Sequence, residues 1–94
     1  MKVAEAKHMS RVKQMQCLIC ARFEDTGEPT EVHHVAEGSG LRSNWSVVPL
    51  CVEHHRGATG FHSGPRQFLM RYRPPGESEY GLLTWLIQDL QEAA

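Results

Sequence analysis

The chain carries two pairs of zinc-ligand residues at finger spacing, and these pairs constrain its fold more than any other feature. The pairs are Cys17-Leu18-Ile19-Cys20 and Cys51-Val52-Glu53-His54, and the second runs directly into His55. Three thiolates and one imidazole complete a tetrahedral structural zinc site. We therefore expect Cys17, Cys20, Cys51 and His54 to bind one zinc ion, with His55 left for a second site. The alternatives are buried cysteines beside a surface His54, or a zinc ribbon without chemistry.

The length of the chain makes a metal useful for folding. We expect 94 residues to form a single domain, 1–94, whose core is marginal because a short chain buries a small fraction of its surface. Three cysteines are an odd number, and no apolar run near Met1 resembles a signal peptide. These features favour a reduced, intracellular protein. No stretch approaches the roughly 18 consecutive apolar residues of a membrane span, so we expect no membrane association.

The net charge hides an asymmetry along the chain. It is −1 overall, which argues against a strongly electrostatic nucleic-acid binder. All ten Lys and Arg residues nevertheless lie within positions 1–73, together with seven of the eleven acidic residues. This excess of positive charge permits contact with a phosphate backbone, although scattered solvated charge explains it equally well.

Periodicity predicts a small mixture of helices and strands. A three-residue repeat of apolar residues predicts a helix over 3–15, and β-branched residues predict strands at 30–35 and 45–50, with Pro49 typical of an edge strand. A short helix carrying Cys51, His54 and His55 should follow, then one or two helical turns over 65–72 that end at Pro74-Pro75. Residues 24–29 and 38–40 are expected to be turns or loops. The spacing of Leu83, Leu86, Ile87 and Leu90 predicts an amphipathic helix over 81–92 that packs on the metal-bearing unit.

A cluster of histidines surrounds the zinc pattern, because five of the six lie between positions 33 and 62. His54 and His55 are successive helical residues about 100° apart, so we expect them to face different metals. Either a continued helix or a loop could bring His62 back to His55. His33 and His34 lie on the preceding strand, where alternating side chains point to opposite faces, so both can act only if the strand twists, bulges or ends there. Otherwise one of the two is structural.

The combined order of these motifs resembles a known family. Cys-x-x-Cys, His33-His34-Val35, a glycine-containing loop, Val48-Pro49-Leu50-Cys51-x-x-His54-His55 and His62 are similar to the HNH superfamily of nucleases, which has the ββα-metal (His-Me) finger fold. The phage Ref (recombination enhancement function) type is closest. The resemblance covers residues 17–64 and implies an α+β fold: a small zinc-stapled ββα-metal finger at about 17–64, flanked by N- and C-terminal helices.

The resemblance implies a role for each matching residue. His34 would be the general base of a DNA phosphodiester hydrolase, and His33, His55 and His62 would hold a catalytic divalent metal, Mg or Mn, with Zn or Ni as alternatives. Two positions depart from the family pattern: Thr59 stands where its last histidine is usual, and Ser46 where its middle asparagine is usual. We assign the orienting role to Asn44, bonding backbone across the loop between the strands, with Ser46 as the alternative.

Partners and alternatives follow from the same pattern. The substrate would be DNA, duplex or single-stranded. Arg42, Arg56 and Arg66 are candidate phosphate contacts, although for each one an ordinary exposed arginine is the simpler explanation. A Ref-like protein would be phage or prophage encoded, would act in the cytoplasm of a bacterial host, and could need a recombinase filament or another DNA-processing protein. Two non-enzymatic hypotheses stay open: a zinc finger that only binds DNA or protein, and a structural adaptor that assembles through its C-terminal helix. The oligomeric state is not predicted.

Overall fold

A two-stranded antiparallel sheet lies at the centre of the molecule. The computed structural model describes residues 1–24, 29–36 and 42–93, so the loops expected at 24–29 and 38–40 fall mostly outside it. Strand β1 (Thr30–His34) pairs with β2 (Val47–Cys51), and His34 lies opposite Val47. Both strands were predicted, but β2 begins two residues later than expected and includes Cys51. Within the described chain β2 has one strand neighbour, as its Pro49 required.

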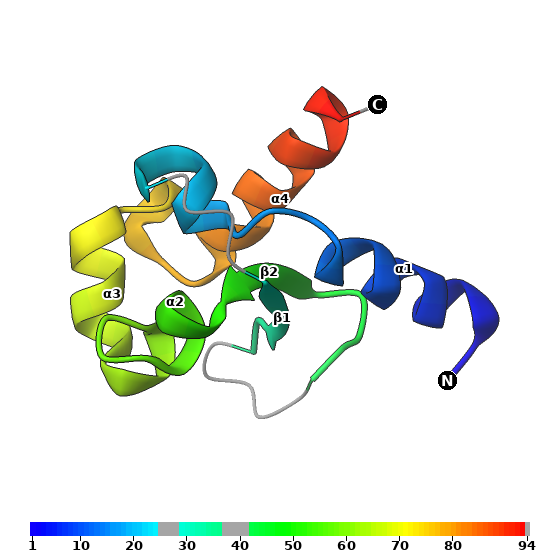
Figure 1. The fold of residues 1–94 in the computed structure, drawn as a ribbon, viewed down its shortest axis with the longest axis horizontal. Coiled ribbons are helices and arrows are strands. Elements are labelled where there is room, and N and C mark those ends of the chain that lie inside the picture. Colours follow the sequence, from blue (N-terminus) through cyan, green and yellow to red (C-terminus); the bar gives the residue numbers. More distant parts are fainter. Residues whose placement is uncertain (25–28, 37–41, 94) are drawn as a thin grey trace.

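Helices surround this sheet on several sides (Figure 1). Helix α1 (Val3–Lys13) contacts both strands, and the predicted helix ends two residues early, at Lys13. The other elements are η1 (Cys20–Glu24), a π-helical turn, α2 (Val52–Arg56), η2 (Phe61–Ser63), α3 (Pro65–Tyr72), η3 (Pro75–Glu77) and α4 (Tyr80–Glu92). The expected α+β fold is confirmed. None of the helices in the described part of the chain has the length and apolar character needed to cross a bilayer.

Helix α4 packs on the core through a face that differs from the predicted one. Leu82 and Leu86 are buried, whereas Ile87, assigned to the buried stripe, is 59% exposed. Leu83 and Leu90 are only partly buried against the core. Residues 82 and 86 lie one turn apart, and 83 and 87 are rotated about 100° from them, so the apolar stripe is wider than the contact surface and the helix uses its other edge. The prediction of the helix is confirmed, and the prediction of Ile87 as a core residue is wrong.

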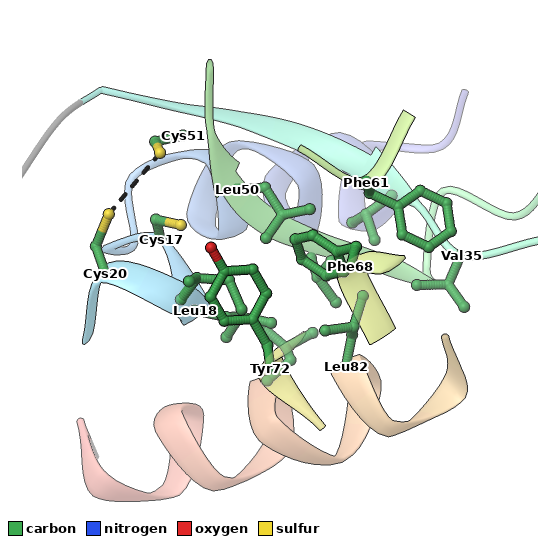
Figure 2. Close-up of a cluster of buried hydrophobic side chains, with 14 of the residues drawn as sticks. Cys17, Leu18, Cys20, Val35, Leu50, Cys51, Phe61, Phe68, Tyr72 and Leu82 are labelled. Carbon is green, nitrogen blue, oxygen red and sulfur yellow. Dashed lines mark hydrogen bonds between the residues drawn. The ribbon is translucent and has the colours of Figure 1, made fainter. Parts of the chain in front are cut away.

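The hydrophobic core joins the sheet to the helices (Figure 2). Leu18 and Ile19, the two residues between Cys17 and Cys20, are fully buried. Leu50 of β2, Phe68 and Tyr72 of α3 and Leu82 of α4 complete one continuous cluster. The three cysteines lie at one end of this cluster, and a dashed line in Figure 2 joins the sulfurs of Cys20 and Cys51. The core therefore fixes the first finger pair against the second.

Candidate active site

The two finger pairs meet in one compact group. Cys17, Cys20, Cys51 and His54 place their ligand atoms within 4.8 Å of one another. Nδ1 of His54 lies 3.6 Å from the sulfurs of Cys17 and Cys20 and 3.2 Å from that of Cys51, and the Cys20 and Cys51 sulfurs are 3.8 Å apart. A tetrahedral ion with bonds of ~2.3 Å to sulfur and ~2.0–2.1 Å to nitrogen separates two sulfurs by about 3.8 Å and sulfur from nitrogen by about 3.6 Å. The group is therefore compatible with a structural zinc ion.

Burial makes this group dependent on a cation. All four residues are at most 1% exposed, and the three cysteines are not joined by disulfides. Burial raises the pKa of the Cys17 thiol, and it raises the pKa of Cys51 to about 12. At neutral pH these thiols would stay protonated in the empty pocket, and a bound zinc ion would favour the thiolates. The ring of Tyr72 packs edge-on against His54 at a centroid distance of 5.6 Å and closes the site from α3.

A second group forms from three histidines. The ligand atoms of His33, His55 and His62 also lie within 4.8 Å of one another. The Nε2 atoms of His55 and His62 are 3.2 Å apart, and both rings have centroids 5.2 Å from that of His33. His54 and His55, neighbours on α2, thus belong to different groups, because successive helical side chains point about 100° apart.

His33 is the buried member of the three-histidine group, and a carboxylate fixes its ring. Its Nε2 lies 2.6 Å from Oε2 of Glu79. An ionised carboxylate only accepts hydrogen bonds, so Nε2 of His33 carries the hydrogen and donates it to Glu79. Among the described residues, Nδ1 of His33 is buried without a hydrogen-bond partner. Burial, followed by the nearby charges of His55 and His62, lowers the pKa of His33 to about 3. A neutral ring with an unpaired buried Nδ1 fits a metal ligand.

His55 is oriented in the same way by a second carboxylate. Its Nδ1 lies 2.9 Å from Oε1 of Glu31, which leaves Nε2 to face His62. Arg56 donates to both oxygens of Glu31 at distances of 3.0 to 3.3 Å. These hydrogen bonds lower the pKa of Glu31 to about 2, so the carboxylate stays charged. Carboxylates that hold the outer nitrogens of histidine ligands are the usual support of a metal site.

His62 lies in a short 3-10 turn. The sequence left open whether a continued helix or a loop brings His62 to His55, and the structure has a turn after the end of α2. Helix α2 ends at Arg56, and η2 returns the chain toward His55. A Cβ atom at Gly60 would lie 2.6 Å from the carbonyl oxygen of Glu53, so only glycine allows this close return. Thr59 instead bonds the carboxylate of Glu53 through its hydroxyl and amide. Burial, then the charges of His55 and Arg42, lowers the pKa of His62 and favours its neutral form.

His34 lies beside this group with one ring nitrogen available as an acceptor. Asn44 donates through its Nδ2 to Glu5, so its Oδ1 faces His34, at 2.8 Å from Nε2. Nε2 therefore carries the hydrogen and Nδ1 is the acceptor, at 3.1 Å from Nη2 of Arg42. Asn44 thus contacts the ring of His34, whereas we expected it to bond backbone across the loop. The backbone of Ser46 accepts a hydrogen bond from the amide of Val35.

Strand β1 ends at His34. We expected that His33 and His34 could share one site only if the strand twists, bulges or ends at that point, and it ends there. His33 and His34 line a pocket of about 350 Å³ together with His55, His62, Arg42 and Glu79. Arg66 is exposed near the start of α3, and no contact places it in this pocket. The supporting acids Glu5, Glu31 and Glu79 were not predicted. Glu31 carried a weak signal, because it lies two residues before His33 on the predicted strand.

These features define a small α+β domain with one closed, zinc-compatible group and one partly open histidine site. The family model described as recombination enhancement, RecA-dependent nuclease matches residues 2–91, and the chain belongs to this family. The Ref part of the resemblance is thereby confirmed, and the protein is a nuclease, an enzyme that acts on nucleic acid. No curated protein and no solved structure matched the chain.

Proposed function

We propose that this protein is a metal-dependent HNH-type endonuclease that hydrolyses DNA phosphodiester bonds. One observation carries the proposal: the ligand atoms of His33, His55 and His62 converge in the same pocket as His34, whose acceptor nitrogen is fixed by Asn44. A hydrolytic site needs a charge-neutralising centre next to a base that works near neutral pH. In this proposal, an ion held by His33, His55 and His62 would neutralise charge, and His34 would be the base.

The proposed general base is Nδ1 of His34. Asn44 holds the tautomer by accepting the Nε2 hydrogen, and Glu5 holds Asn44 in turn. Nδ1 takes a proton from water, the water oxygen bonds to phosphorus in line with the leaving group, and the bond from phosphorus to the 3′ oxygen breaks. The departing 3′ oxygen takes a proton from solvent, and His34 returns its proton to solvent before the next turnover. As the HNH resemblance implies, the products carry 5′-phosphate and 3′-hydroxyl ends.

The three other histidines would hold the catalytic metal through Nδ1 of His33 and the Nε2 atoms of His55 and His62. Mg or Mn is the proposed ion, and the imidazole ligands suit Zn or Ni as well. When bound, the ion supplies a Lewis acid that neutralises charge on the phosphate and the departing 3′ oxygen. The closed Cys3His group is compatible with zinc and would serve folding only.

Arg42 has a defined place in this proposal. Its guanidinium is always charged and donates to Nδ1 of His34 in this structure, so it occupies the atom that must accept the proton. A phosphodiester in the pocket offers Arg42 a better acceptor than a neutral imidazole. Arg42 would move to the phosphate and leave Nδ1 to the water. Arg56 and Arg66 stay candidate phosphate contacts.

The family description supports a proposal about partners. Because the family is described as RecA-dependent, we propose that cleavage requires DNA held in a recombinase filament. A weak intrinsic affinity for DNA would agree with the net charge of −1. A phage or prophage origin and a place in the bacterial cytoplasm complete this proposal.

The test compares DNA cleavage by the zinc-loaded protein and its His34→Ala variant. Plasmid nicking and oligonucleotide cleavage are measured with Mg, Mn, Ni or Zn, with and without a RecA filament. Loss of a general base should lower the rate about 10²- to 10⁴-fold, and Gln91→Ala, an exposed change on α4, should leave it unchanged. Cleavage that survives in His34→Ala removes His34 as the base. No cleavage by the folded wild type under any of these conditions favours a module that only binds.

A further inference from the structure

An exposed tryptophan lies directly beside the proposed catalytic residues. Trp45 is 53% exposed and follows Asn44 in the segment that leads from Arg42 into β2. Asn44 bonds His34, so the tryptophan is one residue from a group in contact with the proposed base. The other tryptophan, Trp85, is partly buried against the core. Unlike Trp85, Trp45 is not among the described residues that pack on the core.

The indole of Trp45 is held in place by helix α1. His8 donates from Nε2 to the carbonyl oxygen of Trp45 at 3.1 Å. The two rings also stack, with centroids 5.0 Å apart and planes tilted by 32°. The indole of Trp45 thus lies against the His8 ring, while about half of the residue stays exposed to solvent, at 53%. A rigid aromatic ring with an open face can stack on a ligand without a large loss of side-chain entropy.

Helix α1 adds positive charge next to this ring. Lys7 and Arg11 are exposed and lie four residues apart, so they are neighbours on one side of the helix, with Cβ atoms about 6 Å apart. Lys7 adjoins His8 in sequence, and Arg11 lies three residues further, on the next turn. In Figure 1, α1 runs beside the segment that enters β2. The one acid of the helix, Glu5, is engaged by Asn44.

We propose that Trp45, Lys7 and Arg11 form a binding platform for a single strand of DNA. An unpaired base stacks on the open face of Trp45, and the phosphates next to it bind Lys7 and Arg11. Only its role in cleavage rests on the proposed function: the platform would hold the strand so that a neighbouring phosphate enters the pocket at His34. Binding by the platform needs no cleavage.

The chemistry favours a single strand over a duplex. An aromatic side chain stacks on the face of a base, and in duplex DNA both faces are covered by the neighbouring base pairs. Stacking tolerates any sequence because every base has such a face. Platform and pocket together would therefore direct the enzyme to unpaired or displaced strands, with little sequence preference.

The first test measures the affinity of the full-length, zinc-loaded protein for labelled oligonucleotides by fluorescence anisotropy at low salt. Trp45→Leu should weaken binding to an oligothymidylate roughly 5- to 150-fold, the range found when one stacking aromatic is removed. Trp45→Phe should stay close to wild type, and duplex binding should change less than about twofold in either variant. The matched control is Phe23→Leu, because Phe23 is 55% exposed but lies against Tyr72 and Trp85, away from α1.

The second test addresses the charges. The double variant Lys7→Gln, Arg11→Gln should reduce the slope of log affinity against log salt by roughly 1.4, at about 0.7 per phosphate contact on a single strand. Arg71→Gln with Arg73→Gln removes the same charge from the end of α3 and the residue that follows it, and should leave the slope unchanged. A slope equally reduced by both double variants would mean that charge acts without a defined site, and would overturn the assignment of Lys7 and Arg11.

The outcomes separate this inference from the proposed nuclease activity. Unchanged single-strand affinity in Trp45→Leu, an equal loss on duplex DNA, or no measurable single-strand binding by the wild type would overturn the platform even if the protein cleaves DNA. A platform verified by binding would stand even if His34→Ala showed that cleavage does not depend on His34.

Discussion

Each of the two groups of potential metal ligands takes one histidine from α2, but one group is buried and the other is partly exposed. His54 joins three cysteines in a group whose members are at most 1% exposed, and apolar side chains surround it. His55, the next residue, joins two histidines in a group that lines a pocket and includes the exposed His62. A site with four protein ligands has no place for a substrate, whereas three ligands leave an open position. One turn of helix thus supplies ligand atoms to a closed group on one side and to an open group on the other.

The supports of the two clusters also differ. Carboxylates of Glu31 and Glu79 hold the outer nitrogens of His55 and His33. The cysteines of the other group are positioned by the buried backbone around Leu18, Ile19 and Leu50. Carboxylate support raises the basicity of a histidine ligand and fixes its orientation. Such tuning matters where a ligand must hold a reactive ion, and packing alone is sufficient where the ion is structural.

The largest expected effect is a difference in the free energy of unfolding when one or the other group of ligands is disrupted. Removal of all zinc by a chelator, or the substitution Cys51→Ser, should unfold the protein, because structural zinc contributes ~10–16 kcal/mol in zinc-finger peptides and a whole domain is stable by only ~5–15 kcal/mol. His62→Ala should leave the free energy of unfolding within about 1 kcal/mol of wild type, since the side chain is exposed. Circular dichroism during thermal and urea unfolding measures both. A chain that keeps its fold after complete zinc removal would contradict the comparison.

A smaller effect is expected from the carboxylate that supports His33. Glu79→Gln keeps the shape of the side chain but removes the charge that fixes the Nε2 hydrogen of His33. If the three-histidine group holds the proposed catalytic metal, we expect Glu79→Gln to weaken its metal binding roughly 10- to 100-fold, with cleavage recovered at high metal concentration. Glu77→Gln is the matched control, because Glu77 is exposed and lies 3.8 Å from Arg73.

The metal dependence of the rate distinguishes positioning from general damage to the fold. A shift of the half-saturating metal concentration with an unchanged maximal rate is the expected signature of Glu79→Gln. An equal loss of rate at every metal concentration, together with a lower melting temperature, would show that Glu79 acts only through packing.

Much of the architecture could be predicted from the sequence because it depends on local spacing. The separation of Cys17 from Cys20, and of Cys51 from His54, predicted one compact group, and the strand and helix patterns predicted the elements that carry it. The separation of His54 and His55 into different groups follows from the angle between successive helical residues. The one long-range meeting among these features, that of the two ligand pairs, follows from the need of a structural zinc ion for four ligands.

The supporting contacts could not be predicted, because they depend on how distant segments pack. Glu79 lies 46 positions from His33, and Glu5 lies 39 from Asn44, and nothing in either local sequence marks a partner. The same limit applied to Ile87, since an apolar stripe shows which helix faces are able to pack but not which one meets the core. Asn44 was chosen by its place in a family pattern, and its contact with the His34 ring came only from the tertiary fold.

The smallest expected effect concerns Arg56, which we predicted as a phosphate contact and which binds Glu31 in the structure. Side chains of this pair are 62% and 32% exposed, so the interaction is screened by solvent. If Arg56 acts through Glu31, Arg56→Gln should weaken metal binding on the order of two- to fivefold and leave the salt dependence of DNA binding unchanged. Arg42→Gln should instead reduce that salt slope by about 0.7 to 0.9, the value for one phosphate contact. A similar reduction of the salt slope in Arg56→Gln would show that Arg56 contacts a phosphate after all. A side chain that supports the open histidine cluster would then also bind the substrate, which is impossible for the fully buried Cys3His group.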